Sequence, residues 1–303
     1  MFKSAKTFIL LAGLAGLLLV VGTALGGRGG ATIALVIALA MNGFSYFFSH
    51  KLAIKMARAV PITEAEAPQL YSVVRSLSMR ANQPMPKLYM SPSPQLNAFA
   101  TGRNPSNGVV CVNRGLYDAL TPEELEGVLG HELQHVYNRD ILVGSVAATI
   151  ATAISYLAMI ARWGAIFGGG GRDRDNNNPL VLLAAAIVAP IAASIVQLAV
   201  TRSRESLADR TGAELTGNPL GLARALAKLD AGAHDPRRLR AGHVPAEANA
   251  AMGHMYISAP FGGAGMSKLF RSHPPISERI EALGEIARER GQLGPTQSVW
   301  DVL

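Results

Sequence analysis

The chain has 303 residues, of which 49% are hydrophobic and 16% charged, and 28 lysines and arginines against 21 aspartates and glutamates give a net charge of +7. A disordered protein has few apolar groups and many charges, so this composition excludes wholesale disorder, and its charged fraction lies below the roughly 25% of a typical soluble protein. The single cysteine, Cys111, excludes a disulfide framework and a cysteine-rich zinc finger, and the apolar run around it predicts a buried strand.

Two apolar segments near the N-terminus, residues 7–25 and 31–48, are long enough to cross a bilayer and are joined by the glycine-rich link 26–30. We therefore expect an N-terminal transmembrane hairpin within residues 1–50. Lysines precede the first segment, and Lys51, Lys55 and Arg58 follow the second, whereas only Arg28 lies between them. The positive-inside rule then places the N-terminus and the chain after residue 48 in the cytoplasm. A cleaved signal peptide is the alternative interpretation of the first segment, although its apolar core is long and another apolar segment follows at once.

Two later segments, residues 141–160 and 180–200, also carry no charge, and a sequence rich in glycine and asparagine separates them. They are either a second transmembrane hairpin or a buried helix pair of the polar domain, and their length favours the membrane. We therefore expect one cytoplasmic domain over residues 51–303, interrupted at 141–200, and about four transmembrane helices in total.

The polar segments predict a mostly helical α+β fold with a small sheet. Apolar spacing predicts a helix over 68–80, and short strands are expected at 87–90, 97–101 and 109–112. Thr121, Pro122 and Glu124 predict a capped helix start, and no breaker interrupts that helix before residue 160. Further helices are expected at 219–230 and 276–290, with a loop over 231–265.

The capped helix contains the pattern H-E-x-x-H, formed by His131, Glu132 and His135. Residues four apart share one helix face, so both histidines can hold one metal ion. Zinc suits two imidazoles and a carboxylate, and it lowers the pKa of a water ligand to about 7. Glu132 points about 100° away from His131 and can take a proton from that water. This pattern predicts one catalytic Zn²⁺ per chain and peptide hydrolysis without a covalent intermediate.

The third metal ligand must come from elsewhere in the chain, and the candidates are Glu205, Asp140, Glu214 and His273. Asp140 follows His135 on what the sequence predicts to be the same rod, so we do not expect it to fold back onto the metal. If the two later apolar segments form an antiparallel hairpin, Glu205 meets the histidines, which makes it the preferred ligand.

Asp209 lies four residues after Glu205 on the same helix face and can accept a hydrogen bond from the second ring nitrogen of a ligand histidine. The alternative for Asp209 is a surface ion pair with Arg202 or Arg210.

Four motifs together, at residues 97–102, 131–135, 204–209 and 272–276, resemble the HtpX family of membrane-bound zinc metalloproteases, which are related to the CAAX prenyl proteases. The resemblance runs nearly end to end and implies a gluzincin-type fold with Glu205 as third ligand and Asp209 in support. It also implies a role in protein quality control and the stress response, with misfolded or damaged membrane proteins hydrolysed at the cytoplasmic face of a bacterial inner membrane.

Two further segments are candidates for contact with a substrate. A strand formed by Asn97, Ala98, Phe99 and Ala100 at the edge of a cleft can pair with an extended substrate backbone, which suits unfolded chains. The alternative is an internal strand with Asn97 at a turn. His273 is a candidate oxyanion donor and, by the resemblance, lies near the site; the alternative is a histidine that only precedes a helix.

Competing functions are processing of a defined substrate such as a prenylated peptide, and a membrane scaffold that binds zinc without catalysis. The intact Glu132 argues against the scaffold. Nucleic acid binding fits the charge, but no stripe of basic and aromatic residues supports it. The cations lie largely beside the apolar segments, where the lipid bilayer is the expected partner.

Overall fold

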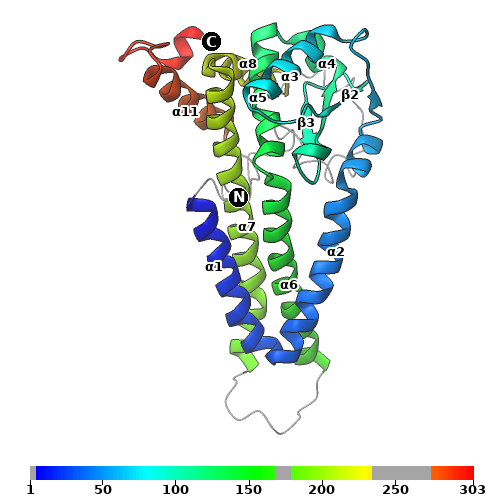
Figure 1. Cartoon of the computed structure of the whole chain (residues 1–303). Helices are drawn as coiled ribbons and strands as arrows, with labels where there is room; N and C mark the ends of the chain where they lie inside the picture. Colours follow the sequence, from blue (N-terminus) through cyan, green and yellow to red (C-terminus); the bar gives the residue numbers. More distant parts are fainter. Residues whose placement is uncertain (1–4, 168–178, 234–273) are drawn as a thin grey trace.

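The computed structural model describes residues 5–167, 179–233 and 274–303. Long apolar helices run side by side, and a small sheet with surrounding helices lies at one end of them (Figure 1). The two parts share helices, because α2, α5–α6 and α7 lead directly from one part into the other.

The apolar part contains α1 (Ala5–Val21), the π-helical segment η1 (Gly22–Gly26), α2 (Gly27–Met56), α6 (Asp140–Phe167) and α7 (Pro179–Thr216). Small and branched side chains such as Leu14, Ala38, Ile154 and Ala193 are fully buried between these helices. The glycine-rich link at residues 26–30 is helical, because η1 runs directly into α2. A helical path satisfies backbone groups internally, as an apolar surrounding requires.

By length and composition, α6 and α7 each contain a candidate membrane span, at Asp140–Trp163 and Leu183–Thr216. The α2 segments Thr32–Phe48 and His50–Met56 count as a third span if this pair, bent by 59°, is one span. With 17 residues, α1 is shorter than a span of this kind. The described residues therefore support two or three spans, where the sequence predicted about four.

The sheet has four strands in the order β1-β2-β4-β3. They are β1 (Val60–Pro61), β2 (Lys87–Ser91), β3 (Ala98–Thr101) and β4 (Val109–Asn113). β2 and β4 are parallel, whereas the other two pairs are antiparallel. The three strands predicted from sequence are confirmed, and within the described sheet β3 is an edge strand.

Helices cover the sheet and provide most of the polar domain's core. They are α3 (Pro68–Arg80), α4 (Arg114–Ala119), α5 (Pro122–Tyr137), α8 (Pro219–Ala233) and α11 (Ile276–Glu289), with 3₁₀ turns at Pro105–Asn107 and Val299–Val302. The predicted capping box is present, because Thr121 accepts from the Glu124 amide while Glu124 accepts from the Thr121 amide. Much of the predicted loop over 231–265 lies outside the described residues, and α8 continues to Ala233.

The helix that the sequence predicts from Pro122 to residue 160 is broken, which corrects that expectation. α5 ends at Tyr137, Arg139 adopts a left-handed conformation with φ of 57°, and α6 begins at Asp140. Asn138 caps α5, and asparagine is among the residues that favour helix ends. The break changes the direction of the chain directly after the second histidine of the H-E-x-x-H pattern.

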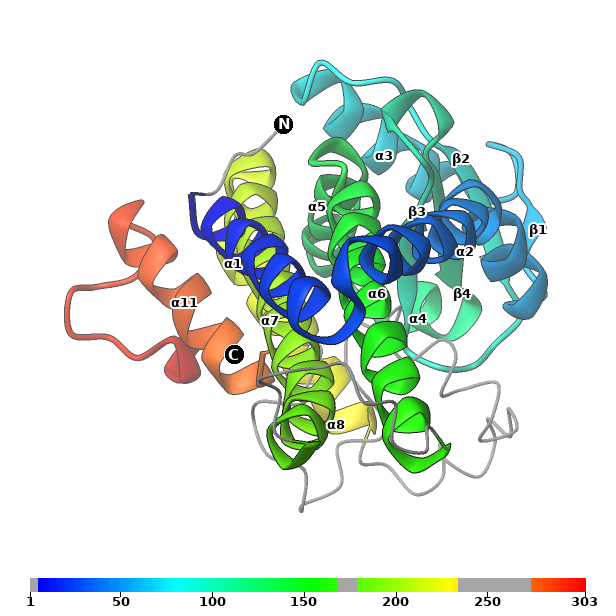
Figure 2. The ribbon, with the colours of Figure 1, turned by 90° about the horizontal axis from the view of Figure 1, so that it is seen from below.

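The end of α2 packs against the sheet and fixes its position. Ala53 of α2, Phe99 of β3 and Cys111 of β4 form one buried cluster. Cys111 is fully buried in its strand, as predicted, and burial raises the pKa of its thiol to about 12. Figure 2 shows β3 between α2 and α5, so the edge strand lies between a long apolar helix and the helix that carries the histidines.

Candidate metal centre

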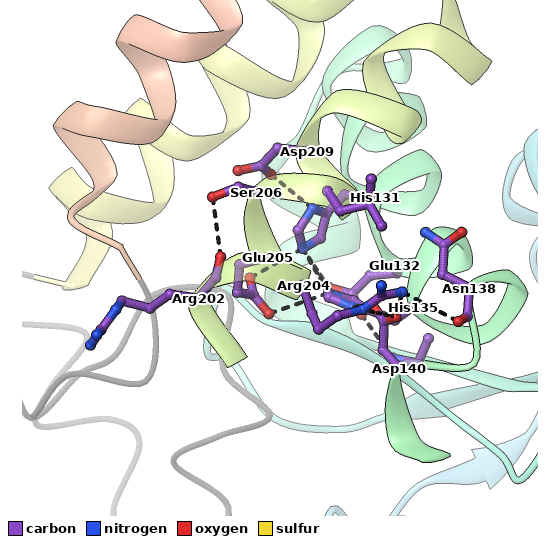
Figure 3. A network of polar contacts seen from close by, with 12 residues as sticks. His131, Glu132, His135, Asn138, Asp140, Arg202, Arg204, Glu205, Ser206 and Asp209 are labelled. Carbon is purple, nitrogen blue, oxygen red and sulfur yellow. Dashed lines mark hydrogen bonds and ion pairs between the residues drawn. The ribbon is translucent and has the colours of Figure 1, made fainter. Parts of the chain in front are cut away.

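Three side chains from two helices converge where α5 and α7 cross (Figure 3). His131 and His135 project from α5, and Glu205 projects from α7. One ligand atom from each residue lies within 4.8 Å of the other two. The two histidine Nε2 atoms are 3.1 Å apart, and the Glu205 carboxylate oxygens lie 3.7 Å from His131 Nε2 and 3.4 Å from His135 Nε2.

Both imidazoles are oriented by carboxylates on their other nitrogen. His131 Nδ1 lies 2.8 Å from Asp209 Oδ1, and His135 Nδ1 lies 2.8 Å from Asp140 Oδ2. A carboxylate acceptor favours a proton on Nδ1, so the two Nε2 atoms, which face each other and the Glu205 carboxylate, are the positions that bind a proton or a metal ion. Three such acceptors in one place repel one another unless a cation lies between them.

The arrangement fits a tetrahedral zinc ion. Ligand atoms about 2.0–2.1 Å from zinc at tetrahedral angles lie about 3.3 Å from one another. The two Nε2 atoms are 3.1 Å apart, and Glu205 Oε1 lies 3.4 Å from His135 Nε2 while Oε2 lies 3.7 Å from His131 Nε2, all close to that value. Two imidazoles and one carboxylate also leave the fourth position that a catalytic zinc site keeps open.

Asp209 has a second partner that the sequence analysis did not identify. Arg279 of α11 donates to it from Nε and Nη2, at 2.8 and 2.7 Å. The arginine side chain is only 2% exposed, and although burial opposes its charge, Asp209 raises the pKa of Arg279. The surface ion pair that was the alternative for Asp209 is therefore wrong. Arg279 lies in the first turn of α11, and its position in the sequence does not indicate that it is buried against an aspartate 70 residues away.

Asp140 is not one of the three converging residues, as expected, but it contacts the other ring nitrogen of His135, because the predicted continuous helix is broken. The break at Arg139 turns Asp140 back toward the ring, and Arg204 donates to the other carboxylate oxygen from Nε at 2.6 Å. Arg204 also donates to the carbonyl of Asn138, so it contacts both sides of the break. The sequence signal that could have revealed this arrangement is Asn138, a common helix-ending residue, two positions before an aspartate.

Glu132 lies beside the three converging residues without joining them. Its Oε1 is 4.0 Å from His131 Nε2, and its Oε2 accepts a hydrogen bond of 2.8 Å from the Ala100 amide of β3. Burial raises the pKa of Glu132, and the two neighbouring histidines act in the opposite direction. The edge strand thus fixes the orientation of the carboxylate that the sequence identified as the base.

Burial by itself would lower the pKa of His135, but the charges of Glu205 and Asp140 outweigh it and raise the pKa to about 10. In the metal-free protein a proton therefore occupies this ring at neutral pH. A cation is favoured at the same place, because the negative charges that retain the proton also attract a metal ion.

Two glycines allow α5 and α7 to approach closely enough to form this site. A Cβ on Gly212 of α7 would lie 2.9 Å from the backbone nitrogen of His131. A Cβ on Gly130 of α5 would lie 2.5 Å from the Thr216 side chain. The close contact places Glu205 and Asp209 opposite His131.

In the predicted substrate segment, residues 97–100, the backbone groups of alternate residues point to opposite edges of the strand. The Asn113 amide donates to the Asn97 carbonyl, so residues 97, 99 and 101 face β4 and the backbone groups of Ala98 and Ala100 point to the other edge. The Phe99 side chain packs on Ala53 and Cys111, and Asn97 is buried just before the strand. His273 lies outside the described residues.

Comparison with known proteins gives a consistent result. The family model described as Peptidase family M48 matches residues 64–287. A protein named Protease HtpX homolog from Pelotomaculum thermopropionicum is 48% identical over 287 residues, covering 94% of this chain and 99% of that protein. Another of that name from Syntrophobacter fumaroxidans is 50% identical over 281 residues, covering 92% and 97%.

Among solved structures, the crystal structure of S. mikatae Ste24p matches with a TM-score of 0.54 and 17% sequence identity. The match covers 92% of this chain and 64% of that one, so this chain spans about two thirds of the length of that protein. At this identity the likeness concerns the fold. The sequence relatives agree with the resemblance inferred from the four motifs.

Proposed function

Since this chain belongs to peptidase family M48, we propose that it is a zinc endopeptidase of a bacterial inner membrane. Its relatives support the broader function of a membrane metalloprotease. Its substrates are misfolded or damaged membrane proteins, cut at the cytoplasmic face as part of protein quality control under stress. The observation that carries this proposal is the convergence of His131, His135 and Glu205 beside a separately held Glu132.

In this proposal His131, His135 and Glu205 hold one zinc ion, which when bound acts as a Lewis acid toward water and the substrate carbonyl. Asp209 and Asp140 keep the two rings in the tautomer that presents Nε2 to the site. Glu132 accepts a proton from the attacking water and delivers it to the leaving amine. In the metal-free site burial raises the pKa of Glu132, and the charge of a bound zinc ion would act in the opposite direction.

The edge of β3 holds the substrate in extended form. Both outward backbone groups of Ala98 and the outward carbonyl of Ala100 pair with a substrate strand, while the Ala100 amide stays on Glu132. This pairing is independent of side-chain identity and therefore suits unfolded chains. His273, as a donor to the developing oxyanion, remains part of the proposal by resemblance alone.

The orientation follows the charge distribution. The cations Lys51, Lys55 and Arg58 follow the apolar part of α2 on the side of the polar domain, and cytoplasmic flanks carry such an excess. The polar domain and the N-terminus are therefore assigned to the cytoplasm.

The test is casein cleavage by protein purified in detergent under a chelator and then supplied with zinc. We expect cleavage by the wild type and a loss of at least about a thousandfold in Glu132→Gln with zinc still bound. Glu123→Gln is the matched control, because Glu123 lies on the same helix with its side chain 68% exposed. Equal cleavage by Glu132→Gln and wild type would refute the assignment of the base, and zinc binding without any cleavage would favour the scaffold function.

A further inference from the structure

We propose that the substrate class of this site is narrower: it cuts extended segments that directly flank a transmembrane helix, within about ten residues of the bilayer. The inference rests on the peptidase function proposed above and concerns where along a membrane protein the cut falls. Its basis is the level of the site relative to the apolar helices.

The candidate metal centre lies at the end of the α6 span. His135 contacts Asp140, which is the first residue of α6 and of its candidate span of 24 residues. At 1.5 Å per residue that span is about 36 Å long, against a hydrocarbon core of about 30 Å. If the span is centred, the core begins only about 3 Å from Asp140, less than one helical turn.

The start of α1 marks the same level. Thr7, near the start of α1, contacts the Ser203 hydroxyl at 3.2 Å, two residues before Glu205 on α7. On α1 the exposed apolar side chains begin directly afterwards, with Phe8 at 57% exposure. The exposed apolar surface of α1 thus begins at about the level of Glu205 on α7.

The segment that follows the edge strand β3 is hydrogen-bonded to the aromatic part of α2. The Tyr46 hydroxyl donates to the Arg103 carbonyl at 2.6 Å, and Arg103 follows β3 by two residues. Around Tyr46 the side chains of Phe44, Phe47 and Phe48 are exposed, as in the aromatic belts of membrane proteins. Lys51 and Lys55 follow, where anionic headgroups are expected.

The direction of β3 relative to α2 follows from two contacts. Its Thr101 end leads to Arg103 at Tyr46, whereas Phe99 packs on Ala53, seven residues farther from the apolar part of α2. From Thr101 back to Ala98, β3 therefore runs away from the aromatic level of α2 and from the apolar helices. Ala100, whose amide holds Glu132, is three residues from Arg103, or at most about 10 Å of extended chain.

A chain leaving the bilayer can therefore pair with β3 at once. Adding about 5–8 Å of headgroup region to the 10 Å of strand places the cleavable bond about five extended residues from the end of the substrate's span. A segment held far above the membrane meets this edge less often, since it must return to the headgroup level.

The experiment uses the full chain in proteoliposomes with reporter proteins that have one transmembrane helix and an unfolded casein-derived segment. In the first reporter the segment follows the span directly. The second has twelve prolines between them, a stiff spacer of roughly 37 Å, and the third has twelve Gly-Ser residues, a flexible spacer of roughly 20 Å. Cut positions are identified by mass spectrometry. Reporters without the span control for effects of the spacer itself, and Glu132→Gln controls for other proteases.

We expect cuts within about ten residues of the span in the first reporter, cleavage at least about tenfold slower with the proline spacer, and substantial recovery with the flexible one. Equal Glu132-dependent rates for the direct and proline-spaced reporters would overturn this inference and leave the peptidase function intact. Cleavage of soluble casein with all membrane reporters resistant would also overturn it. Absence of Glu132-dependent cleavage of any substrate, soluble casein included, would refute the proposed function itself.

Discussion

Asp140 Oδ2 lies 2.8 Å from His135 Nδ1, although the two residues belong to different helices. The contact exists because Arg139, in the left-handed conformation, turns the chain between them. The same carboxylate pairs with Arg204, the neighbour of Glu205 on α7. One aspartate therefore connects a candidate ligand, the start of a membrane span and the helix that carries the third ligand.

The first prediction concerns this aspartate. Asp140→Asn removes the charge that orients His135 and leaves Arg204 without its partner carboxylate, so zinc affinity should fall by about 10–100-fold. Competition with a chromogenic chelator measures the change. Asp118→Asn, which alters an exposed pair with Arg114, is the control and should leave the affinity unchanged. An unchanged affinity in Asp140→Asn would mean that His135 is held by its helix alone.

Arg279 is expected to be essential for stability, because its removal leaves the buried Asp209 carboxylate without its cationic partner, with His131 Nδ1 still beside it. Arg279→Leu should lower the free energy of unfolding in mild detergent by about 3–5 kcal/mol. Replacement of both residues, as Arg279→Leu with Asp209→Asn, should cost less than the sum of the two single changes. Arg288→Ala, at a more exposed pair, should change stability by less than about 1 kcal/mol. Additive effects at Arg279 and Asp209 would contradict the pairing.

Gly212 is expected to determine how closely α7 approaches His131. In Gly212→Ala the new methyl group would lie 2.9–3.1 Å from backbone atoms of His131 and Gly130, which cannot move independently of α5. The helices must then separate, and we expect a loss of about 1–3 kcal/mol together with weaker zinc binding. Gly144→Ala, where nothing lies within 4 Å, should stay within about 1 kcal/mol of wild type. Thermal unfolding of the two variants is measured with and without zinc. Equal stability and equal zinc stabilisation in Gly212→Ala and Gly144→Ala would show that Gly212 is not needed for the approach of α7 to α5.

Zinc binding should release protons at neutral pH. The pKa of His135 is raised to about 10 in the metal-free protein, so its ring carries a proton at pH 7–8 that a metal ion must displace. Because one proton leaves, apparent affinity should fall by about tenfold for each pH unit below this pKa. Calorimetric titration of zinc in two buffers of different ionisation enthalpy measures the number of protons released. Release of none at pH 8 would show that His135 is neutral before the metal binds.

Local sequence alone determined much of the site and its surroundings. The capped start at Thr121 and the i, i+4 spacing of His131 and His135 depend on short-range helix geometry, so both could be predicted. The same holds for α3 and for strands β2 to β4, which glycines and prolines separate. The proximity of Glu205 and Asp209 to the histidines followed from the expected pairing of the two apolar segments.

The tertiary structure decided what depends on contacts between distant residues. A single left-handed residue, Arg139, brings Asp140 to His135 Nδ1, and no periodic pattern reports one backbone torsion. Arg279 reaches Asp209 from 70 residues away, and Ala100 reaches Glu132 from another layer of the fold. The residue types that the chemistry requires could thus be recognised from short stretches of sequence. The contacts that orient these residues depend on the packing of distant segments.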